Sequence, residues 1–195
     1  MQFFQLDTLG NVNDSELGLS DGAPEGMELH SYCMAFGDST HLLYPAEAKI
    51  SLREDRPGIK LSSLLGNTNS YLIVHSTMKD VIEAHCQGIE VEFLPFDLHD
   101  HRKRLYSRDY FIINPLGTHD CLDPVASGVQ RGPEGSVIHV ESYTLDPRKA
   151  THLPRLLRPN EDPSVYIVSE ELASALRDKG FTNVQLNPLP FSPGS

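Results

Sequence analysis

The stretch from Tyr71 to Phe96, "YLIVHSTMKDVIEAHCQGIEVEFLPF", joins two apolar runs through a middle with helical spacing. "YLIV" has the composition of a short buried strand. The positions that then share one helix face are Met78, Val81, Ile82 and His85. Thr77 and Asp80 have capping-box spacing, Gly88 ends the helix, and "IEVEFL" alternates as a half-buried strand does. The sequence predicts a strand–helix–strand unit here.

A second stretch, "VYIVSEELASALRDKGFTNVQLNPLPF" from Val165 to Phe191, repeats this design with different residues. The two copies lie 94 residues apart at Val74 and Val168, and 95 residues apart at Phe96 and Phe191. Their alignment therefore needs one inserted residue. Two copies are too few for a solenoid, so we expect either an internal duplication or two similar units within one domain.

The helix of the second copy has clear end signals. Ser169 is a suitable N-cap, and Glu170 and Glu171 lie in the first turn, where the helix dipole favours acids. Gly180 is the C-cap candidate. We expect three side chains to face the core: Leu172, Ala175 and Leu176. The run "VQLNPL" then forms the second strand.

The rest of the chain is richer in strands than in helices. Residues 10–28 are expected to form a loop, and residues 151–159 an irregular segment or one turn of helix. Further strands are expected at 29–37, in "AKISL" before Arg53, at 110–114 and at 136–146. The sequence predicts a single α+β domain over residues 1–195, with a mixed β-sheet, short helices and two similar strand–helix–strand units.

The net charge of −11 is concentrated in the first quarter of the chain. Residues 1–48 contain eight acids and no Lys or Arg, whereas the remaining 147 residues hold 19 acids and 16 bases. Such a field disfavours nucleic acid and membrane surfaces as partners and attracts basic proteins. The alternative is a solvated acidic face that only keeps the protein soluble.

Cysteine use and hydropathy favour a cytoplasmic protein. No apolar run approaches about 18 residues, so no membrane span is expected. The N-terminal stretch "MQFFQLDTLG" has no basic residue before its apolar part, unlike a signal peptide. The cysteines are three and far apart, which indicates free thiols in a reducing compartment, packed as small apolar groups: Cys33, Cys86 and Cys121.

Motifs for catalysis or cofactor binding are absent from the sequence: there is no phosphate-binding glycine loop, GxSxG elbow or CxxC pair. The segment "DLHDHRKR" places His99 and His101 on either side of Asp100. Together with His119 and Asp120 they could form a site of two histidines and a carboxylate. Three bases follow directly and oppose a cation, so we favour a solvated polar loop, without metal or cofactor.

Asp120 and Asp123 form the one tight acid pair beside an expected strand. Paired carboxylates can perform acid–base chemistry, but turn and capping roles are commoner for an aspartate before proline. Cys121 has no identifiable helix N-terminus or neighbouring base, so we interpret it as a packing residue. We therefore expect no catalytic residues and no enzymatic activity.

The run "YFIINPLGTHDCLDPVAS", from Tyr110 to Ser127, resembles the strand, aspartate, Cys-Leu-Asp and serine pattern of the myxobacterial-type family of bacterial polymorphic-toxin immunity proteins. The resemblance covers about residues 60–190, and residues 1–48 match no family. Its matching positions are Asp120, Asp123 and Ser127 in the centre and Ile167, Val168, Ser169, Leu172 and Leu176 near the end.

This resemblance implies a cytoplasmic antidote that binds and blocks a cognate toxin delivered by neighbouring cells. Some toxins paired with the family are nucleases, whose basic groove for phosphate an acidic protein can occupy. The repeated units contain core, cap and strand-stop residues, so function is expected on loops and charged surface outside them. The candidate toxin-binding residues are Asp14, Glu16, Asp21, Glu25, Asp97, Asp100, Asp120 and Asp123.

Two alternatives remain open at this point. One is a small metal-dependent enzyme that uses His99, His101 and His119. The other is a structural or regulatory protein without a toxin partner, whose acidic face serves solubility alone. Metal in a purified sample would favour the first, and a large neighbouring gene ending in a toxin domain would argue against the second.

Overall fold

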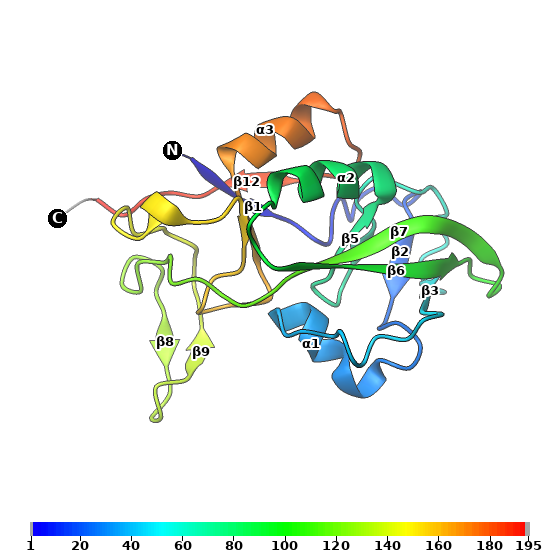
Figure 1. Cartoon of the computed structure of the whole chain (residues 1–195), viewed down its shortest axis with the longest axis horizontal. Coiled ribbons are helices and arrows are strands. Elements are labelled where there is room, and N and C mark those ends of the chain that lie inside the picture. The colour runs from blue at the N-terminus through cyan, green and yellow to red at the C-terminus, as the bar shows by residue number, and fades with distance from the viewer. Residues whose placement is uncertain (1, 194–195) are drawn as a thin grey trace.

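The computed structural model describes residues 2–193 and contains an α+β fold with mixed sheets and short helices, as predicted (Figure 1). One sheet has the order β10-β11-β1-β12: Leu156–Leu157, Tyr166–Ser169, Phe3–Leu6 and Leu186–Pro188. A larger sheet has the order β4-β2-β3-β6-β7-β5: Gly66–Asn67, Leu19–Asp21, Lys49–Leu52, Val91–His99, Leu105–Pro115 and Leu72–His75. A separate hairpin pairs β8 (Gln130–Arg131) with β9 (Val137–His139).

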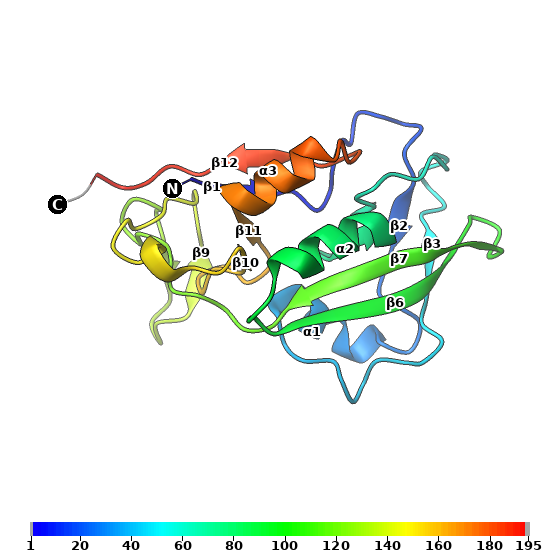
Figure 2. The same ribbon diagram turned by 45° about the horizontal axis from the view of Figure 1, so that its top comes forward.

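The helices of the described residues are short. They are α1 (Ser31–Phe36), α2 (Ser76–His85), α3 (Glu170–Asp178) and the 3-10 turns η1 (Glu28–His30) and η2 (Ala150–His152). Helices α2 and α3 lie side by side over the sheets, whereas α1 lies on the other side of the β6–β7 hairpin (Figures 1 and 2). Within residues 2–193 no helix is long and apolar enough to cross a membrane.

Both predicted units are present, but their two strands do not pair with each other. In the first unit, β7 lies between β5 and β6 and is antiparallel to both. In the second unit, β1 lies between β11 and β12 in the same manner. The strand at the start of the acidic N-terminal segment therefore completes the second unit and belongs to the core of the domain.

The register confirms the alignment of the first strands. Val74 of β5 lies opposite Phe111 of β7, and Val168 of β11 lies opposite Phe4 of β1. The two central strands thus place Phe111 and Phe4 at equivalent positions. Both lie in or against one apolar core that is shared by the two units. This shared core is the physical reason for the repeated pattern, because each strand–helix–strand unit covers the apolar face of the other.

The closing strands are not aligned as the Leu-Pro-Phe runs suggest. Phe111 pairs with Pro95 on its second side, and Phe4 pairs with Pro188. The equivalent prolines are therefore 93 residues apart, and the match of Phe96 with Phe191 is shifted by two residues. A shift of two residues keeps side chains on the same face of a strand, so the apolar pattern alone could not reveal it.

Helix caps differ between the units. Ser169 is the N-cap of α3, as predicted, and its hydroxyl accepts a hydrogen bond from the Leu172 backbone N–H at 3.4 Å. In α2 the N-cap is His75, whose ring accepts from the Thr77 N–H at 3.3 Å, so the predicted capping box is wrong. The helix begins at Ser76, which is one residue earlier than a cap at Ser76 requires and two residues earlier than a cap at Thr77 requires.

The buried face of α3 consists of Leu172, Ala173 and Leu176, and Ala175 is only half-buried. The expectation for the two leucines is confirmed, and Ala173 replaces Ala175. In α2, Met78 and Ile82 are fully buried, with Val81 and His85 at the margin of the same face. Both helices therefore contribute a narrow apolar stripe to the shared core.

Two predicted strands are wrong or too long. Residues 29–37 form the end of η1 and helix α1, which Gly37 terminates with φ of +80°. The predicted strand at 136–146 is limited to β9. The expected loop at 10–28 contains the short strand β2. By contrast, "AKISL" does form β3, and the strand predicted at 110–114 is the end of the longer β7.

A buried arginine, Arg158, joins α1 to the rest of the domain. Its guanidinium donates hydrogen bonds to the carbonyl oxygens of Met34, Ala35 and Pro163 at 2.8, 2.7 and 2.6 Å. It also donates to the Tyr166 hydroxyl at 2.6 Å and lies over that ring. Burial lowers the pKa of Arg158 and raises that of Tyr166. The segment 151–159, expected to be irregular or one turn of helix, contains the end of the 3-10 turn η2 and strand β10, and its Arg158 connects α1 to the rest of the domain.

Candidate protein-interaction surface

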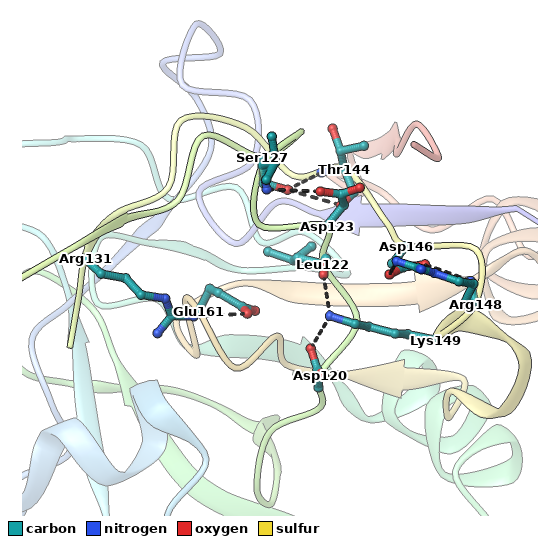
Figure 3. A network of polar contacts seen from close by, with 11 residues as sticks. Asp120, Leu122, Asp123, Ser127, Arg131, Thr144, Asp146, Arg148, Lys149 and Glu161 are labelled. Carbon is teal, nitrogen blue, oxygen red and sulfur yellow. Dashed lines mark hydrogen bonds and ion pairs between the residues drawn. The ribbon is translucent and has the colours of Figure 1, made fainter. Parts of the chain in front are cut away.

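The acid pair at Asp120 and Asp123 belongs to a network of polar contacts in which it holds the local chain (Figure 3). Asp120 Oδ1 accepts from Lys149 Nζ at 2.7 Å, and Lys149 also donates to the Leu122 carbonyl at 2.9 Å. Asp123 accepts from the backbone N–H groups of Val125 and Ala126, which hold its pKa below the usual range. Asp123 thus has the turn role expected of an aspartate before proline, whereas Asp120 forms an ion pair with Lys149.

The same network closes on Ser127, the third central position of the family resemblance. Ser127 Oγ donates to the Thr144 carbonyl and accepts from the Thr144 N–H, both at 3.1 Å. Nearby, Arg148 bonds to both oxygens of Asp146 and holds the pKa of that carboxyl at about 2. Figure 3 shows these side chains along adjoining loop segments. The arrangement is one of loop closure, and each carboxylate named here has an internal partner.

The other candidate toxin-binding acids are spread over the domain. Asp14 accepts from the Glu16 backbone N–H, Glu16 lies 3.9 Å from Lys60, Asp97 lies 3.2 Å from Arg108, and Asp100 lies 2.6 Å from Arg104. The hydrogen bonds from Arg104 bring the pKa of Asp100 to about 2. Asp21 and Glu25 differ: they are exposed and form no ion pair within the described residues.

The histidines of the alternative metal site are not assembled into one. Within residues 2–193, no group of three or more His, Cys, Asp or Glu side chains could hold a metal ion. His99 Nδ1 lies 3.0 Å from the Lys103 carbonyl at the β6–β7 turn. His119 lies in another loop, where its backbone pairs with Arg158 and Asn160. The sequence analysis grouped His99 and His119 as possible ligands of one metal, but in the fold they lie in different loops.

The cysteines are buried and free, as the sequence predicted. Burial raises the pKa of Cys86 to about 11 and that of Cys121 to about 12. A thiol that stays protonated is a poor nucleophile, so Cys121 is a packing residue in the core formed with Phe3 and Leu122.

A surface that the sequence analysis did not single out lies on and around α1. Leu29 and Leu42 are 87% and 92% exposed, and Tyr32, Phe36 and Leu43 are about half exposed. Leu29, Tyr32 and Phe36 follow the i, i+3, i+7 spacing of one helix face. That spacing was present in the sequence, but the segment was predicted to be a strand. A helix face this apolar is normally covered, and this one faces outward.

Most of the unpaired acids of the protein's first quarter lie in residues 21–47, within this segment or next to it in the chain. Seven of the eight acids in residues 1–48 have no ion pair within the described residues, whereas 11 of the 19 in the remainder have one. We define the α1 surface by its exposed apolar residues and the exposed unpaired acids of this segment: Leu29, Tyr32, Phe36, Leu42, Leu43, Asp21, Glu25, Glu28, Asp38 and Glu47.

Internal hydrogen bonds hold the α1 surface in place. Burial alone would raise the pKa of Glu92, but hydrogen bonds from Ser39, Asn114 and Thr40 lower it. These bonds fix the loop after α1 on the end of the β6–β7 hairpin. The loop and helix are already ordered in the free protein. Binding of a partner would therefore cost them little conformational entropy.

Comparisons with known proteins leave the family open. No protein-family model matches the chain, and no curated protein matches it in sequence. The resemblance to toxin-immunity proteins therefore stays a prediction from short motifs. The function is inferred from the surface of the molecule.

Proposed function

We propose that this protein is an immunity-type antidote that binds a basic protein toxin through the α1 surface and blocks the toxin's working face. The observation that carries the proposal is the combination of exposed apolar side chains with unpaired acids in one segment that has no Lys or Arg. Protein interfaces have an apolar centre and a polar rim, and a few aromatic anchors dominate their affinity. Tyr32 and Phe36 are the aromatic anchors here.

The charge of the α1 surface specifies the chemistry of the partner. Exposed carboxylates without internal ion pairs attract positive charge, and they repel the phosphates of nucleic acid and anionic lipid. A nuclease toxin has a basic groove for phosphate, so it matches this surface. An acidic protein that covers such a groove inhibits by occlusion and needs no catalytic residue of its own.

The test is protection of a growing cell. The product of the neighbouring gene is expressed with this protein or with its Tyr32→Asp/Phe36→Asp variant, and complex formation is measured with the purified pair. We expect the wild type to bind and restore growth and the variant to fail. Because the substitutions add negative charge, a loss would report apolar contact rather than weaker attraction to a basic partner.

A matched control is Ile59→Asp/Leu105→Asp, which changes charge equally at two half-exposed apolar residues outside the α1 surface. This variant should protect as the wild type does. A neighbouring product that neither arrests growth nor binds would contradict the immunity function. Equal protection by both variants would exclude the α1 surface as the binding site.

A further inference from the structure

A second cluster of exposed apolar side chains lies at the turn end of the β6–β7 hairpin. Ile59, Leu105 and Tyr106 are about half exposed, and the Tyr106 hydroxyl donates to the Ile59 carbonyl at 2.9 Å. Two adjoining hollows of about 500 and 430 Å³ both have Ile59 and Tyr106 in their walls. We define the tip surface as the exposed side chains of residues 56–60 and 100–106.

The tip surface is basic, in contrast to the α1 surface. Its two segments, 56–60 and 100–106, contain five bases and one acid, Asp100. Asp100 pairs closely with Arg104, whereas Arg102 is exposed and forms no ion pair within residues 2–193. The surface therefore attracts an acidic partner.

Two further cations of the tip surface are only loosely paired. Lys60 lies 3.9 Å from Glu16, and Lys103 lies 3.8 Å from Glu54. All four side chains are exposed, and an exposed pair of this kind contributes little energy. Both lysines can therefore turn to a carboxylate of a partner at small cost.

The α1 surface has the complementary properties. Its apolar face, formed by Leu29, Tyr32 and Phe36, is flanked by exposed acids, and residues 1–48 contain no Lys or Arg. An amphipathic helix with such a face suits a hollowed apolar surface, where its side chains enter the hollows. Apolar groups would then meet apolar groups at the centre of the contact, and acids would meet bases at its rim.

We propose that the α1 surface of one molecule packs on the tip surface of a second copy. The loop after α1 is held at the opposite end of the hairpin, where Thr40 donates to Glu92 and Asn114 donates to the Asp38 carbonyl (Figure 1). From Glu92 to Asp100 the strand spans about 25 Å, so the contact forms between molecules. Such a head-to-tail contact leaves one free surface at each end, so further copies can add.

This inference goes beyond the proposed function and does not depend on it, because no toxin takes part. The net charge of −11 makes two copies repel each other, so we expect weak association, with a dissociation constant on the order of 10–100 µM. Where a toxin also binds the α1 surface, it would compete with the second copy.

The experiment is sedimentation velocity of the full chain from 10 to 500 µM, with the concentrations set by about that constant. The wild type should sediment faster as its concentration rises. Tyr32→Asp/Phe36→Asp and Ile59→Asp/Leu105→Asp should each stay monomeric alone. Their equimolar mixture should form a dimer that grows no further, because each variant retains the surface that the other has lost.

Two more variants control for charge and for folding. Val125→Asp/Ile138→Asp adds the same charge at exposed apolar residues outside both surfaces and should associate as the wild type does. Arg102→Glu/Lys103→Glu changes exposed side chains of the tip surface only, so it should fold normally and weaken association about tenfold.

Three results would overturn the inference: a wild type that is monomeric at every concentration, a monomeric mixture of the two surface variants, or association of Ile59→Asp/Leu105→Asp at the wild-type level. Equal loss in Val125→Asp/Ile138→Asp would do the same, because added charge would then explain the effect. Failure of the proposed function is seen separately, since self-association is measured without a toxin.

Discussion

Helices α3 and α1 both have large apolar side chains with acids nearby. At α3 these side chains are buried or in ion pairs, whereas at α1 many of them are exposed and unpaired. In α3, Leu172 and Leu176 are buried, and the acids of the first turn have partners: Glu170 lies 3.6 Å from Arg177, and Glu171 lies 2.8 Å from Arg155. These side chains of α3 therefore contact other residues of the domain. They stabilise the fold and are not free to contact a partner.

In and beside α1, the side chains that face outward are neither buried nor in ion pairs. Tyr32 and Phe36 are half exposed, and the acids on either side, Glu28 and Asp38, form no ion pair within the part of the chain described. What holds α1 is its inner side, through the buried Met34 and the hydrogen bonds of Arg158. The contrast separates stability from binding: substitutions in α3 and at Arg158 should act on folding, and substitutions on the outer side of α1 should act on affinity.

The largest effect is expected from Arg158→Ala, which removes the connection between α1 and the body. The change leaves buried carbonyl oxygens and the Tyr166 hydroxyl without their donor, and each such loss costs about 1–3 kcal/mol. We expect a loss of at least about 4 kcal/mol in the free energy of unfolding, measured by urea denaturation. The control is Arg155→Ala, at an exposed ion pair, which should cost less than about 1 kcal/mol. Similar midpoints would show that Arg158 is not the connection described.

Leu176→Ala tests the buried side of α3. Leu176 is fully buried in the shared core, so its truncation should cost about 2–5 kcal/mol. Arg177, one residue on, is not a neutral control because its guanidinium stacks on the Phe4 ring at 4.3 Å. Asp178→Ala is the better one: the residue is exposed and has no ion pair within residues 2–193, so it should stay within about 0.5 kcal/mol. Coincident urea transitions for both variants would contradict the orientation of the helix.

Tyr32→Ser/Phe36→Ser should weaken binding and leave stability nearly unchanged, whereas Leu176→Ala should lower stability. Neither side chain is buried, so the free energy of unfolding should change by less than about 1 kcal/mol. If these rings are the anchors of the interface, affinity for the toxin partner should fall by about 30-fold or more, which corresponds to about 2 kcal/mol. Calorimetry of the purified pair measures the affinity, and the melting midpoint gives the control. A strongly destabilised variant would place these rings in the core instead.

The sequence predicted the local parts of this fold and missed the non-local ones. The first strand and helix of each unit were correct because apolar spacing, Ser169 and Gly180 are local signals. The insertion of β1 between β11 and β12 depends on pairing across 160 residues or more, which no local pattern encodes. Helix α1 was missed because six residues give too short a period to distinguish from a strand.

The candidate site was harder to predict for a related reason. The acidic character of residues 1–48 was visible in the sequence, but ion pairing was not. Asp97 and Arg108 are 11 positions apart and meet only because β6 and β7 form a hairpin. A buried Arg158 or Glu161 is likewise invisible in composition, because both residue types are normally exposed.

The smallest effect is expected from charges alone, and it concerns rates. Neutralising four unpaired acids of the α1 surface, as Asp21→Asn/Glu25→Gln/Asp38→Asn/Glu47→Gln, should slow association with the toxin by about tenfold and flatten its salt dependence. Dissociation should change less, because rim charges act on the encounter. Asp14 and Glu16 are left intact because they hold a turn and an ion pair. Stopped-flow mixing at two salt concentrations gives both rates.

A second quadruple variant tests whether association depends on the acids of the α1 surface or on the net charge of the whole protein. Asp80→Asn/Glu83→Gln/Glu170→Gln/Glu171→Gln removes the same number of charges from α2 and α3, across the β6–β7 hairpin from α1 (Figure 1). Those four acids lie in ion pairs with Lys79, Arg155 and Arg177, which offset most of their charge, so their contribution to the outer field is smaller. We expect this variant to associate at nearly the wild-type rate. Equal slowing in the two variants would mean that net charge steers the partner, and wild-type rates in both would leave the acids of the α1 surface with solubility as their role.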